Sequence, residues 1–434
     1  MTTSPPRPTT SAAPKRVDPD YPLSAVPLSE RRSSASVIIV VVGFLFFTPT
    51  MLTGGTVAVQ FPFSQFMLLA LASAAVLAAY IALIGTISAR TGLTTVLLAR
   101  TVFGRIGGKW SSILLGGTQV GWYGITLATL ADLMGRTFGW ETTWPIAVVG
   151  GIVMAITAYS GMKGIEILSW ISVPLMLILC IWVLVLALGE TGGFGGLLAT
   201  GETGQLSIGA AMTMMIATFI SGGTQVGNWT RFARSGRVAL LITFASVLLC
   251  QFAMLFFGGV GAAAYGQGDF AELMVQLGLI GAAMILLVAN LWTTNDNTAY
   301  AFGVAGAELA GKADKRPFVV IGVVVGIIIA VSELGGALVP FLSLLGVLIP
   351  PLGGALIGYF FLVWKGRDPG IRYGTEPLVR WSGLAAYAAG TVAAALGSTL
   401  DVGLPAVQGI VVAILVAPLA AAVERRIGSE SRAA

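Results

Sequence analysis

The sequence contains no histidine and only two cysteines, Cys180 and Cys250, each inside an apolar run. Without an imidazole the chain can build no histidine proton relay, no histidine metal site and no Ser-His-Asp triad. Neither cysteine has an acidic neighbour, so we interpret both as buried thiols rather than as a disulfide or a metal site. No cofactor is expected, and an intramembrane enzyme is the least favoured class.

Charge is also scarce. Asp, Glu, Lys and Arg make up 10% of the 434 residues, whereas soluble domains carry about 25%. Apolar residues reach 56% and the mean hydropathy is +0.90. Too few charges remain to cover a water-soluble surface of this size, so the composition predicts an all-α polytopic membrane protein.

Apolar runs recur along the chain at lengths near the ~20 residues that cross a bilayer as a helix. The twelve runs lie at 37–60, 64–88, 111–139, 143–160, 164–188, 207–229, 237–264, 273–300, 317–336, 338–363, 381–398 and 403–423. Residues 1–35, rich in Pro, Ser and Thr, are expected to form a disordered cytoplasmic tail. No apolar core closely follows the first methionine, so we expect no cleaved signal peptide.

The basic residues test this count of twelve spans. With the N-terminus inside, every Lys and Arg of the 24 except Arg136 falls in an inner segment. The outer loops carry acids instead: Glu141, Glu190, Glu202, Asp269, Glu272 and Asp401. An error of one span would reverse every later loop and destroy this positive-inside pattern. We therefore expect a multi-pass protein of the inner (plasma) membrane with both termini cytoplasmic, residues 424–434 forming the C-terminal tail.

Four spans contain helix-breaking or polar residues. The first and sixth read FLFFTPTMLTGG (44–55) and ATFISGGTQVGNW (217–229), with a proline or a glycine pair that weakens the helix. The third and eighth carry GGTQVGWYG (116–124) and ANLWTTNDN (289–297). In lipid, a broken helix is tolerated where it lines a cavity. Each glycine pair taken alone is better explained by helix packing.

Depth brings these four spans together. Counted from the inner ends at ~1.5 Å per residue, six residues lie about 12–17 Å deep, near the middle of a ~30 Å hydrocarbon core. They are Phe47, Gln119, Trp122, Phe219, Ser221 and Asn290. Asp132 and Asp296 lie closer to opposite helix ends, where water reaches them, and we interpret them as helix-end or gating acids.

The pairing of spans one with six and three with eight has an offset of five, which is odd, so the second copy is inverted. This pattern predicts a five-plus-five inverted repeat of the LeuT-like type, with helices 1 and 6 broken. The first repeat spans 36–188 and the second 189–363; peripheral spans 11 and 12 occupy 364–423.

A layer with two aromatic rings and two carboxamides suits a neutral, planar heterocycle. Trp122 and Phe219 can stack on a ring, and Gln119 and Asn290 each supply donors and an acceptor. No Lys or Arg lies at that depth to neutralise an anionic substrate. Backbone carbonyls at the breaks and the hydroxyls of Thr50, Thr293 and Thr294 favour Na⁺ over a proton as coupling ion.

The sequence resembles the cytosine permeases of the nucleobase–cation symporter family over about 36–423. The motifs are TGLTTVLLAR (91–100), LLGGTQVGW (114–122), TFIS (218–221), RFAR (231–234), LWTTNDN (291–297) and IPPLGG (349–354). Three residues depart from the expected pattern: Thr218 replaces a serine, and Asn228 and Gly358 replace acids.

The resemblance implies import of cytosine with sodium. Cytosine would lie between Trp122 and Phe219, hydrogen-bonded by Gln119, Ser221 and Asn290. Thr218 and Gly222 would line the site. Na⁺ would be held by the carbonyls of Phe47, Thr50 and Asn290 and by the hydroxyls of Thr293 and Thr294.

Other readings stay open from the residues alone. The same fold could carry a purine, uracil or a hydantoin, or couple to protons, and a passive channel for small neutral solutes is a more distant alternative. Nothing indicates a nucleic-acid partner or an obligate protein partner.

Overall fold

The computed structural model describes residues 18–201, 204–332, 338–368, 370 and 373–433, and every regular element in these ranges is helical. The all-α prediction is confirmed for these residues. Glu202, which the sequence places in an outer loop, lies outside the described residues. In the first half of the chain the elements are η1 (Leu28–Glu30), α1 (Ser34–Leu45), α2 (Thr48–Ala58), α3 (Phe63–Thr91), α4 (Thr95–Phe138), α5 (Trp144–Tyr159), α6 (Met162–Glu190) and α7 (Phe194–Leu198). In the second half they are α8 (Ile208–Thr224), α9 (Gly227–Thr230), α10 (Gly236–Tyr265), α11 (Phe270–Gln276), α12 (Ile280–Ala310), α13 (Arg316–Val331), α14 (Leu338–Gly358), η3 (Tyr359–Val363), α15 (Trp381–Thr399) and α16 (Pro405–Ala433).

Within the described ranges, five helical stretches are long and apolar enough to cross a membrane by length and composition. They are Phe63–Thr91, Met162–Glu190, Gly236–Gln276, Leu344–Val363 and Pro405–Ile427. The bent pair α1 and α2 makes a sixth if it counts as one span. Helices α4 and α12 are also long, but they carry the polar stretches that the sequence places at the site. All twelve predicted apolar runs overlap helices, but helix length and apolar composition alone identify fewer than twelve spans.

The first span is broken where α1 meets α2. The two helices are bent by 53°, with Phe46 and Phe47 extended between them. Pro49 lies in the first turn of α2, where the missing N–H has no helical partner to lose. The break therefore precedes Pro49, and Gly54 and Gly55 lie inside continuous helix.

The second break separates α8 from α9 at Gln225 and Val226. Gly222 and Gly223 belong to the last turns of α8, so this helix ends just beyond the glycine pair that predicted the break. Both glycines have a packing role, because a Cβ on Gly222 would lie 2.8 Å from the Phe44 ring and one on Gly223 would overlap Ile81.

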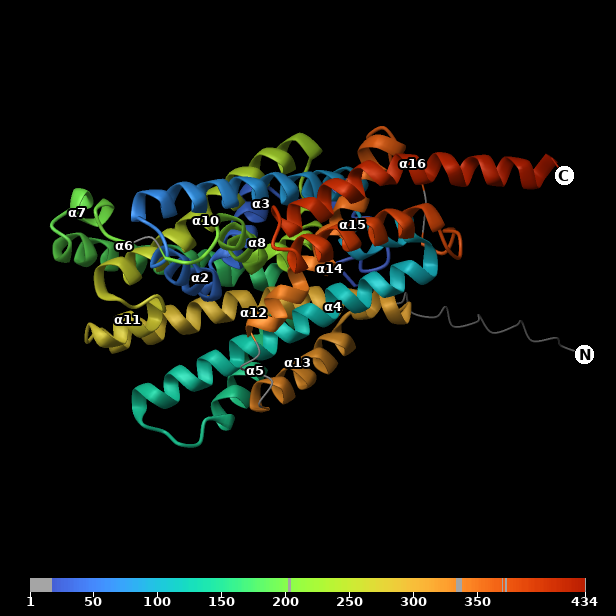
Figure 1. Cartoon of the computed structure of the whole chain (residues 1–434). Helices are drawn as coiled ribbons and strands as arrows, with labels where there is room; N and C mark the ends of the chain where they lie inside the picture. Colours follow the sequence, from blue (N-terminus) through green and yellow to red (C-terminus); the bar gives the residue numbers. More distant parts are fainter. Residues whose placement is uncertain (1–17, 202–203, 333–337, 369, 371–372, 434) are drawn as a thin grey trace, which may run out of the picture.

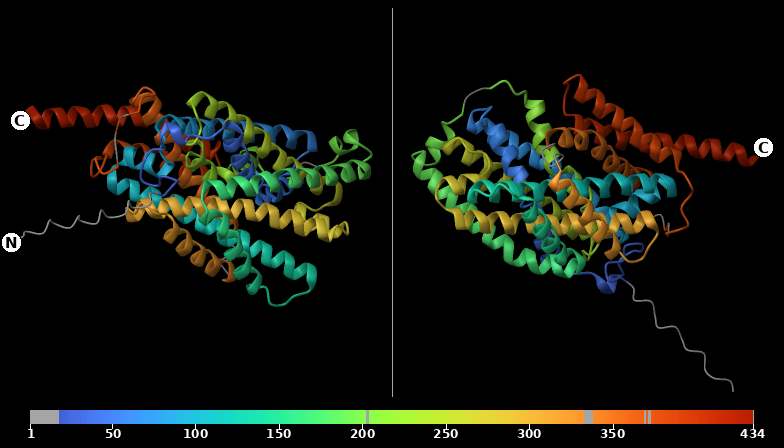
Figure 2. Two further views of the ribbon diagram at one scale, coloured as in Figure 1. Left: turned by 180° about the vertical axis from the view of Figure 1, so that it is seen from behind. Right: turned by 90° about the horizontal axis from the view of Figure 1, so that it is seen from below.

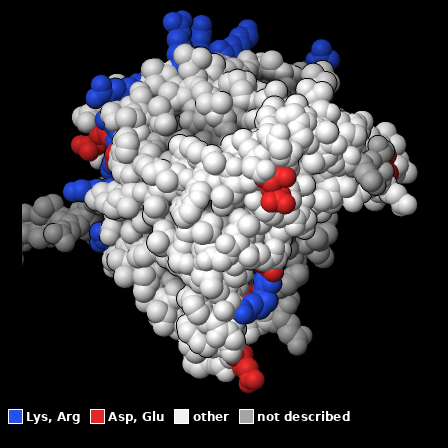
Figure 3. All heavy atoms as spheres, turned by 90° about the vertical axis from the view of Figure 1, so that its left-hand side faces the viewer, with Lys and Arg blue, Asp and Glu red and all other residues white. Residues whose placement is uncertain are grey.

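The helices run side by side along one direction, and the first described residues lie at the same end of the bundle as the end of α16 (Figure 1). The two further views agree: α16 projects at that end, while α7 and the turn after α4 lie at the opposite end (Figure 2). Seen from the opposite end, the surface is largely uncharged, with scattered acidic and basic groups (Figure 3).

Residues 18–33 make defined contacts, although the sequence suggested a disordered tail through residue 35; residues 1–17 lie outside the described residues. Lys315 Nζ lies 2.6 Å from Asp20 Oδ2 and 3.4 Å from Asp18 Oδ1, and all three side chains are at most 5% exposed. Arg231 Nη1 donates to the Tyr21 carbonyl at 2.9 Å, and Val26 N donates to the Gly92 carbonyl at 3.0 Å. The segment thus joins several predicted inner loops.

The predicted outer loops meet one another as well. Arg136 pairs with Asp132 at 2.9 Å and with Glu272 at 3.2 Å, and Phe63 N donates to the Thr200 carbonyl at 3.0 Å. Loops expected on one side of the membrane therefore share one end of the bundle. At the C-terminus, helix α16 continues to Ala433, so the predicted C-terminal tail at 424–434 is helical over its described residues. Both cysteines are buried free thiols.

Candidate substrate-binding site

A small buried cavity lies where the two breaks meet α4 and α12. Its lining residues all lack charge: Phe44, Phe47, Gln119, Trp122, Thr218, Phe219, Ser221, Gly222, Thr294 and Thr298. Six of the seven residues predicted to bind substrate are among them. The exception is Asn290, which does not line the cavity. The structure thus brings residues that are distant in sequence, from α4, α8, α12 and the first break, to one cavity.

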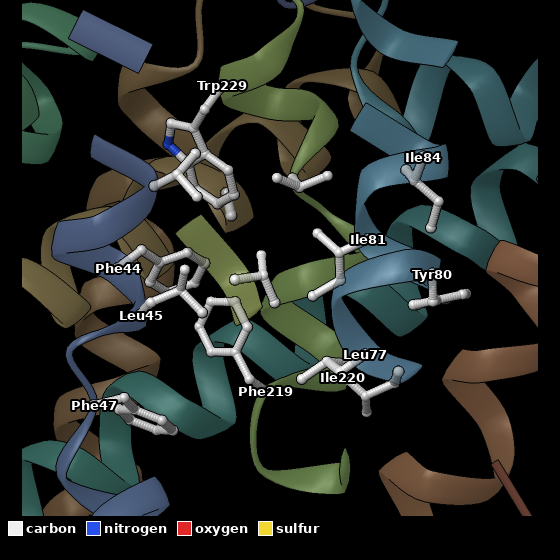
Figure 4. Packing of buried hydrophobic residues seen from close by; sticks show 14 of the residues in the cluster. Phe44, Leu45, Phe47, Leu77, Tyr80, Ile81, Ile84, Phe219, Ile220 and Trp229 are labelled. Carbon is white, nitrogen blue, oxygen red and sulfur yellow. The ribbon is translucent and has the colours of Figure 1, made fainter. Parts of the chain in front are cut away.

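The cavity measures about 10 Å³, which is room for about one water molecule. Its aromatic rings pack edge to face: Phe47 on Trp122 at 5.0 Å and Phe44 on Phe219 at 4.9 Å between centroids. Phe44 also contacts Trp229, at 4.9 Å, so it lies between Trp229 and Phe219 (Figure 4). A flat ring would enter between Trp122 and Phe219 only if these side chains move apart.

Gln119 is the most conspicuous polar group in the cavity. It is 0% exposed, and neither Oε1 nor Nε2 has a hydrogen-bond partner among the described residues. Leaving a buried polar group unpaired costs about 1–3 kcal/mol, and such groups in native proteins require an explanation. A ligand that hydrogen-bonds both atoms would supply one.

Other polar groups in the cavity are held by neighbours. Trp122 Nε1 donates to Ser221 Oγ at 2.9 Å, which fixes the indole plane against α8. Gln251 of α10 donates to Thr218 Oγ1 at 3.0 Å and to the Met215 carbonyl at 2.9 Å. These hydrogen bonds hold the lining residues Trp122 and Thr218 in position.

Asn290 is held by the first break. Thr48 donates to Asn290 Oδ1 twice, from its backbone N at 3.1 Å and from Oγ1 at 2.7 Å. Asn290 is 2% exposed. The contact joins the start of α2 to α12 next to the cavity.

The predicted cation ligands lie on these same two elements. Thr50 Oγ1 and Thr294 Oγ1 are buried and without hydrogen-bond partners in the described structure. Thr293 Oγ1 instead donates within its own helix, to the Asn290 carbonyl at 2.9 Å, and the Phe47 carbonyl accepts from Thr50 N at 3.0 Å. Two orphan hydroxyls and the carbonyls at a helix break are oxygen donors of the kind that suits a hard monovalent cation.

Two residues lining the cavity were missed by the sequence prediction. Phe44 lies one turn before Phe47, and Thr298 lies one turn after Thr294. Helical spacing from Thr294 could have found Thr298, since residues four apart share a helix face, whereas the break between Phe44 and Phe47 interrupts that spacing.

Asp296 differs from its expected setting. It lies in the middle of α12 and is 0% exposed, so water does not reach it as predicted; Asn297 Nδ2 donates to its Oδ1 at 3.1 Å. Asp132 is 65% exposed and pairs with Arg136, as expected of a helix-end acid.

The two positions where an acid was expected have different settings. Asn228 is 1% exposed, and both of its amide atoms lack partners within the described ranges. Gly358 lies where α14 meets α16, and a Cβ there would come within 2.8 Å of the Ile414 carbonyl. An acidic side chain could not fit at that contact.

Comparison with known proteins identifies the family. Residues 25–421 match the profile described as "permease for cytosine/purines, uracil, thiamine, allantoin". The chain belongs to this permease family. It is a multi-pass membrane transporter and not an enzyme, as the sequence predicted.

The permease is also similar to individual members. It is 35% identical to the cytosine permease of Escherichia coli strain K12 over 345 residues, covering 80% of this chain and 82% of the relative. The cytosine permease of Escherichia coli O157:H7 matches with the same identity and coverage.

Solved structures confirm the LeuT-like fold. Mhp1, a nucleobase-cation-symport-1 family transporter in a closed conformation with bromovinylhydantoin bound, superposes with a TM-score of 0.79 at 17% identity, covering 92% of the permease and 94% of that chain. MhsT in complex with L-phenylalanine gives a TM-score of 0.55 at 15% identity, with 90% and 97% covered.

Proposed function

We propose that the permease imports cytosine together with Na⁺ by alternating access, through twelve membrane spans arranged as a five-plus-five inverted repeat. The observation that carries the proposal is the buried carboxamide of Gln119, unpartnered inside a cavity whose lining residues are all uncharged. A neutral base with mixed donor and acceptor edges matches that amide. The likeness to cytosine permeases supports the same substrate class.

In this mechanism the base stacks between Trp122 and Phe219 and bonds to Gln119, Ser221 and Asn290, with Thr218 and Gly222 beside it. The packed aromatic rings must separate for the base to enter, and they would close over it afterwards. The aromatic residues that line the cavity would then shield the bound base from water on both sides of the membrane.

Sodium would be held by the carbonyls of Phe47, Thr50 and Asn290 and the hydroxyls of Thr293 and Thr294. These atoms belong to the first break and to α12, so the ion would draw the two elements together. Because Asn290 belongs to both predicted ligand sets, ion and base would each raise the affinity for the other by the same factor.

The test is uptake of radiolabelled cytosine into proteoliposomes containing the purified permease, with and without an inward Na⁺ gradient. We expect accumulation above equilibrium that collapses when the gradient is removed. Unlabelled purines, uracil and hydantoins serve as competitors. Stronger competition by one of them would reassign the substrate, and uptake that follows a pH gradient while ignoring Na⁺ would reassign the ion.

A variant pair tests the cation ligands. Thr294→Ala removes an unpartnered hydroxyl and should raise the Na⁺ concentration for half-maximal uptake about tenfold, the effect of losing roughly 1.4 kcal/mol. Thr298→Ala, one turn away on the same helix face and outside the predicted cation set, is the matched control. An equal effect of the two variants on Na⁺ dependence would contradict the assignment.

A further inference from the structure

The contact between Thr48 and Asn290 determines which atoms of the Asn290 amide can bind a ligand. Thr48 is 6% exposed and Asn290 is 2% exposed. The backbone N and Oγ1 of Thr48 both approach the same atom, Asn290 Oδ1, at 3.1 and 2.7 Å.

The orientation of this amide follows from the chemistry of its partner. A backbone N–H can only donate, so the atom facing it must be the amide oxygen and not the nitrogen. An amide oxygen has two lone pairs, and Thr48 supplies two donors. The acceptor capacity of Asn290 is thus filled by one residue, and its NH₂ group alone remains for a ligand.

We propose that Thr48 is a positioning residue that makes Asn290 a hydrogen-bond donor only, and thereby selects bases that present an acceptor to it. This inference rests on the proposed function, and it deepens it by assigning the polarity of one contact. The ligand class is a planar base that presents an unprotonated ring nitrogen, which is an acceptor, to the NH₂ group of Asn290. Cytosine and uracil make a sharp pair of probes, because ring nitrogen N3 is an acceptor in cytosine and a donor in uracil.

The neighbouring groups explain why the hydroxyl of Thr48 has this role. Thr53, on the same short helix, donates its hydroxyl back to the Pro49 carbonyl at 2.9 Å, which is the usual local bond of a helical threonine. Thr48 lies in the first turn of α2, directly after the break. Its hydroxyl bonds across to α12 instead. The break therefore lets the Thr48 hydroxyl bond to another helix, whereas in a continuous helix it would bond to a carbonyl of the preceding turn.

The experiment measures uptake of cytosine and uracil in proteoliposomes by the wild type and by three variants. Thr48→Val keeps the shape and the backbone N–H but removes the hydroxyl, Thr48→Ser restores a hydroxyl, and Thr53→Val is the matched control. We expect Thr48→Val to raise the KM for cytosine about tenfold, the value of one hydrogen bond, with the maximal rate within about twofold. The ratio of the uracil KM to the cytosine KM should narrow by a similar factor, while Thr48→Ser and Thr53→Val stay near the wild type.

Three results would overturn the proposal: an equal rise of both KM values in Thr48→Val, a Thr48→Ser variant as impaired as Thr48→Val, or the same selectivity change in Thr53→Val. If the wild type takes up no base at all, the proposed function fails instead. The contact is then tested on the full-length purified protein by the thermal unfolding of Thr48→Val, Asn290→Ala and the double variant. If the two side chains are coupled, the double variant should be as stable as the less stable of the two single variants. Additive losses of stability would show that Thr48 and Asn290 do not act together.

Discussion

At the scale of single residues, hydrogen bonding distinguishes three fully buried glutamines. Gln225 and Gln251 are as deeply buried as Gln119, but each donates from Nε2 to a backbone carbonyl, at 3.1 and 2.9 Å. The side chain of Gln119 makes no hydrogen bond from either amide atom within the described residues. Burial alone would not distinguish these three amides, whereas their hydrogen bonds do.

This difference predicts opposite effects on stability for the same substitution. Gln119→Leu should abolish cytosine uptake yet leave the thermal unfolding temperature unchanged or raised, because no hydrogen bond is lost and two unpaired polar atoms are removed. Gln225→Leu, the matched control, should lower stability by about 1 kcal/mol. Thermal unfolding of the purified variants measures both, and a Gln119→Leu protein that unfolds earlier than Gln225→Leu would contradict this interpretation.

At the scale of elements, glycine allows the first broken span to lie directly against α10. A Cβ on Gly54 would overlap the backbone of Leu255, and a Cβ on Gly258 would overlap the Met51 carbonyl. The two helices therefore approach by their backbones, in the manner of small-residue contacts between membrane helices. The packing explanation of Gly54 and Gly55 agrees with this structure, and the break lies before Pro49 rather than at the glycine pair.

Gly54→Ala should accordingly cost about 1–3 kcal/mol of stability, because the backbones must move apart. Gly117→Ala is the control: nothing lies within 4 Å of its Cβ position, and alanine inside a helix is more favourable than glycine by about 1 kcal/mol. The two variants should shift the unfolding temperature in opposite directions, and a shift of the same sign would show that the contact is looser than described.

The segment before α1 depends on a buried ion cluster. Lys315→Met should leave Asp18 and Asp20 buried without their cation, at a cost of about 3–5 kcal/mol. Breaking the pair at the other end of the bundle with Asp132→Asn should cost at most about 1 kcal/mol, since those side chains are more than half exposed. Unfolding temperatures that fall equally in both variants would argue against a structural role of residues 18–33.

At the scale of the whole molecule, the structure brings together the loops that the positive-inside rule groups, as the contacts of Asp20 and Arg136 show. Which end faces the cytoplasm is a prediction of that rule. Single cysteines at Glu141 and at Arg367 test it in otherwise wild-type protein, because Cys180 and Cys250 are buried. A membrane-impermeant maleimide should label Glu141→Cys in intact cells and Arg367→Cys only after lysis. The reverse labelling pattern would show that the protein has the opposite orientation in the membrane.

Composition and helical periodicity suffice to predict the class of protein and much of the candidate site. Sparse charge and long apolar runs admit only a helical membrane protein, and the fixed rise of a helix places residues at a common depth. That is why Gln119, Trp122, Phe219 and Ser221 could be grouped before any contact was known. The same periodicity also reaches Thr298 from Thr294, one turn earlier in α12.

Contacts that depend on the rotation of a helix and on its neighbours are visible only in the folded chain. Depth counts residues along an axis but not the direction in which a side chain points, so Asn290 was expected in the cavity lining and lies next to it, with its amide oxygen bonded to Thr48. Asp296 was expected near water and is sealed among packed helices. Helix breaks likewise occur where neighbouring elements supply new hydrogen-bond partners, and such partners come from parts of the chain that are distant in sequence.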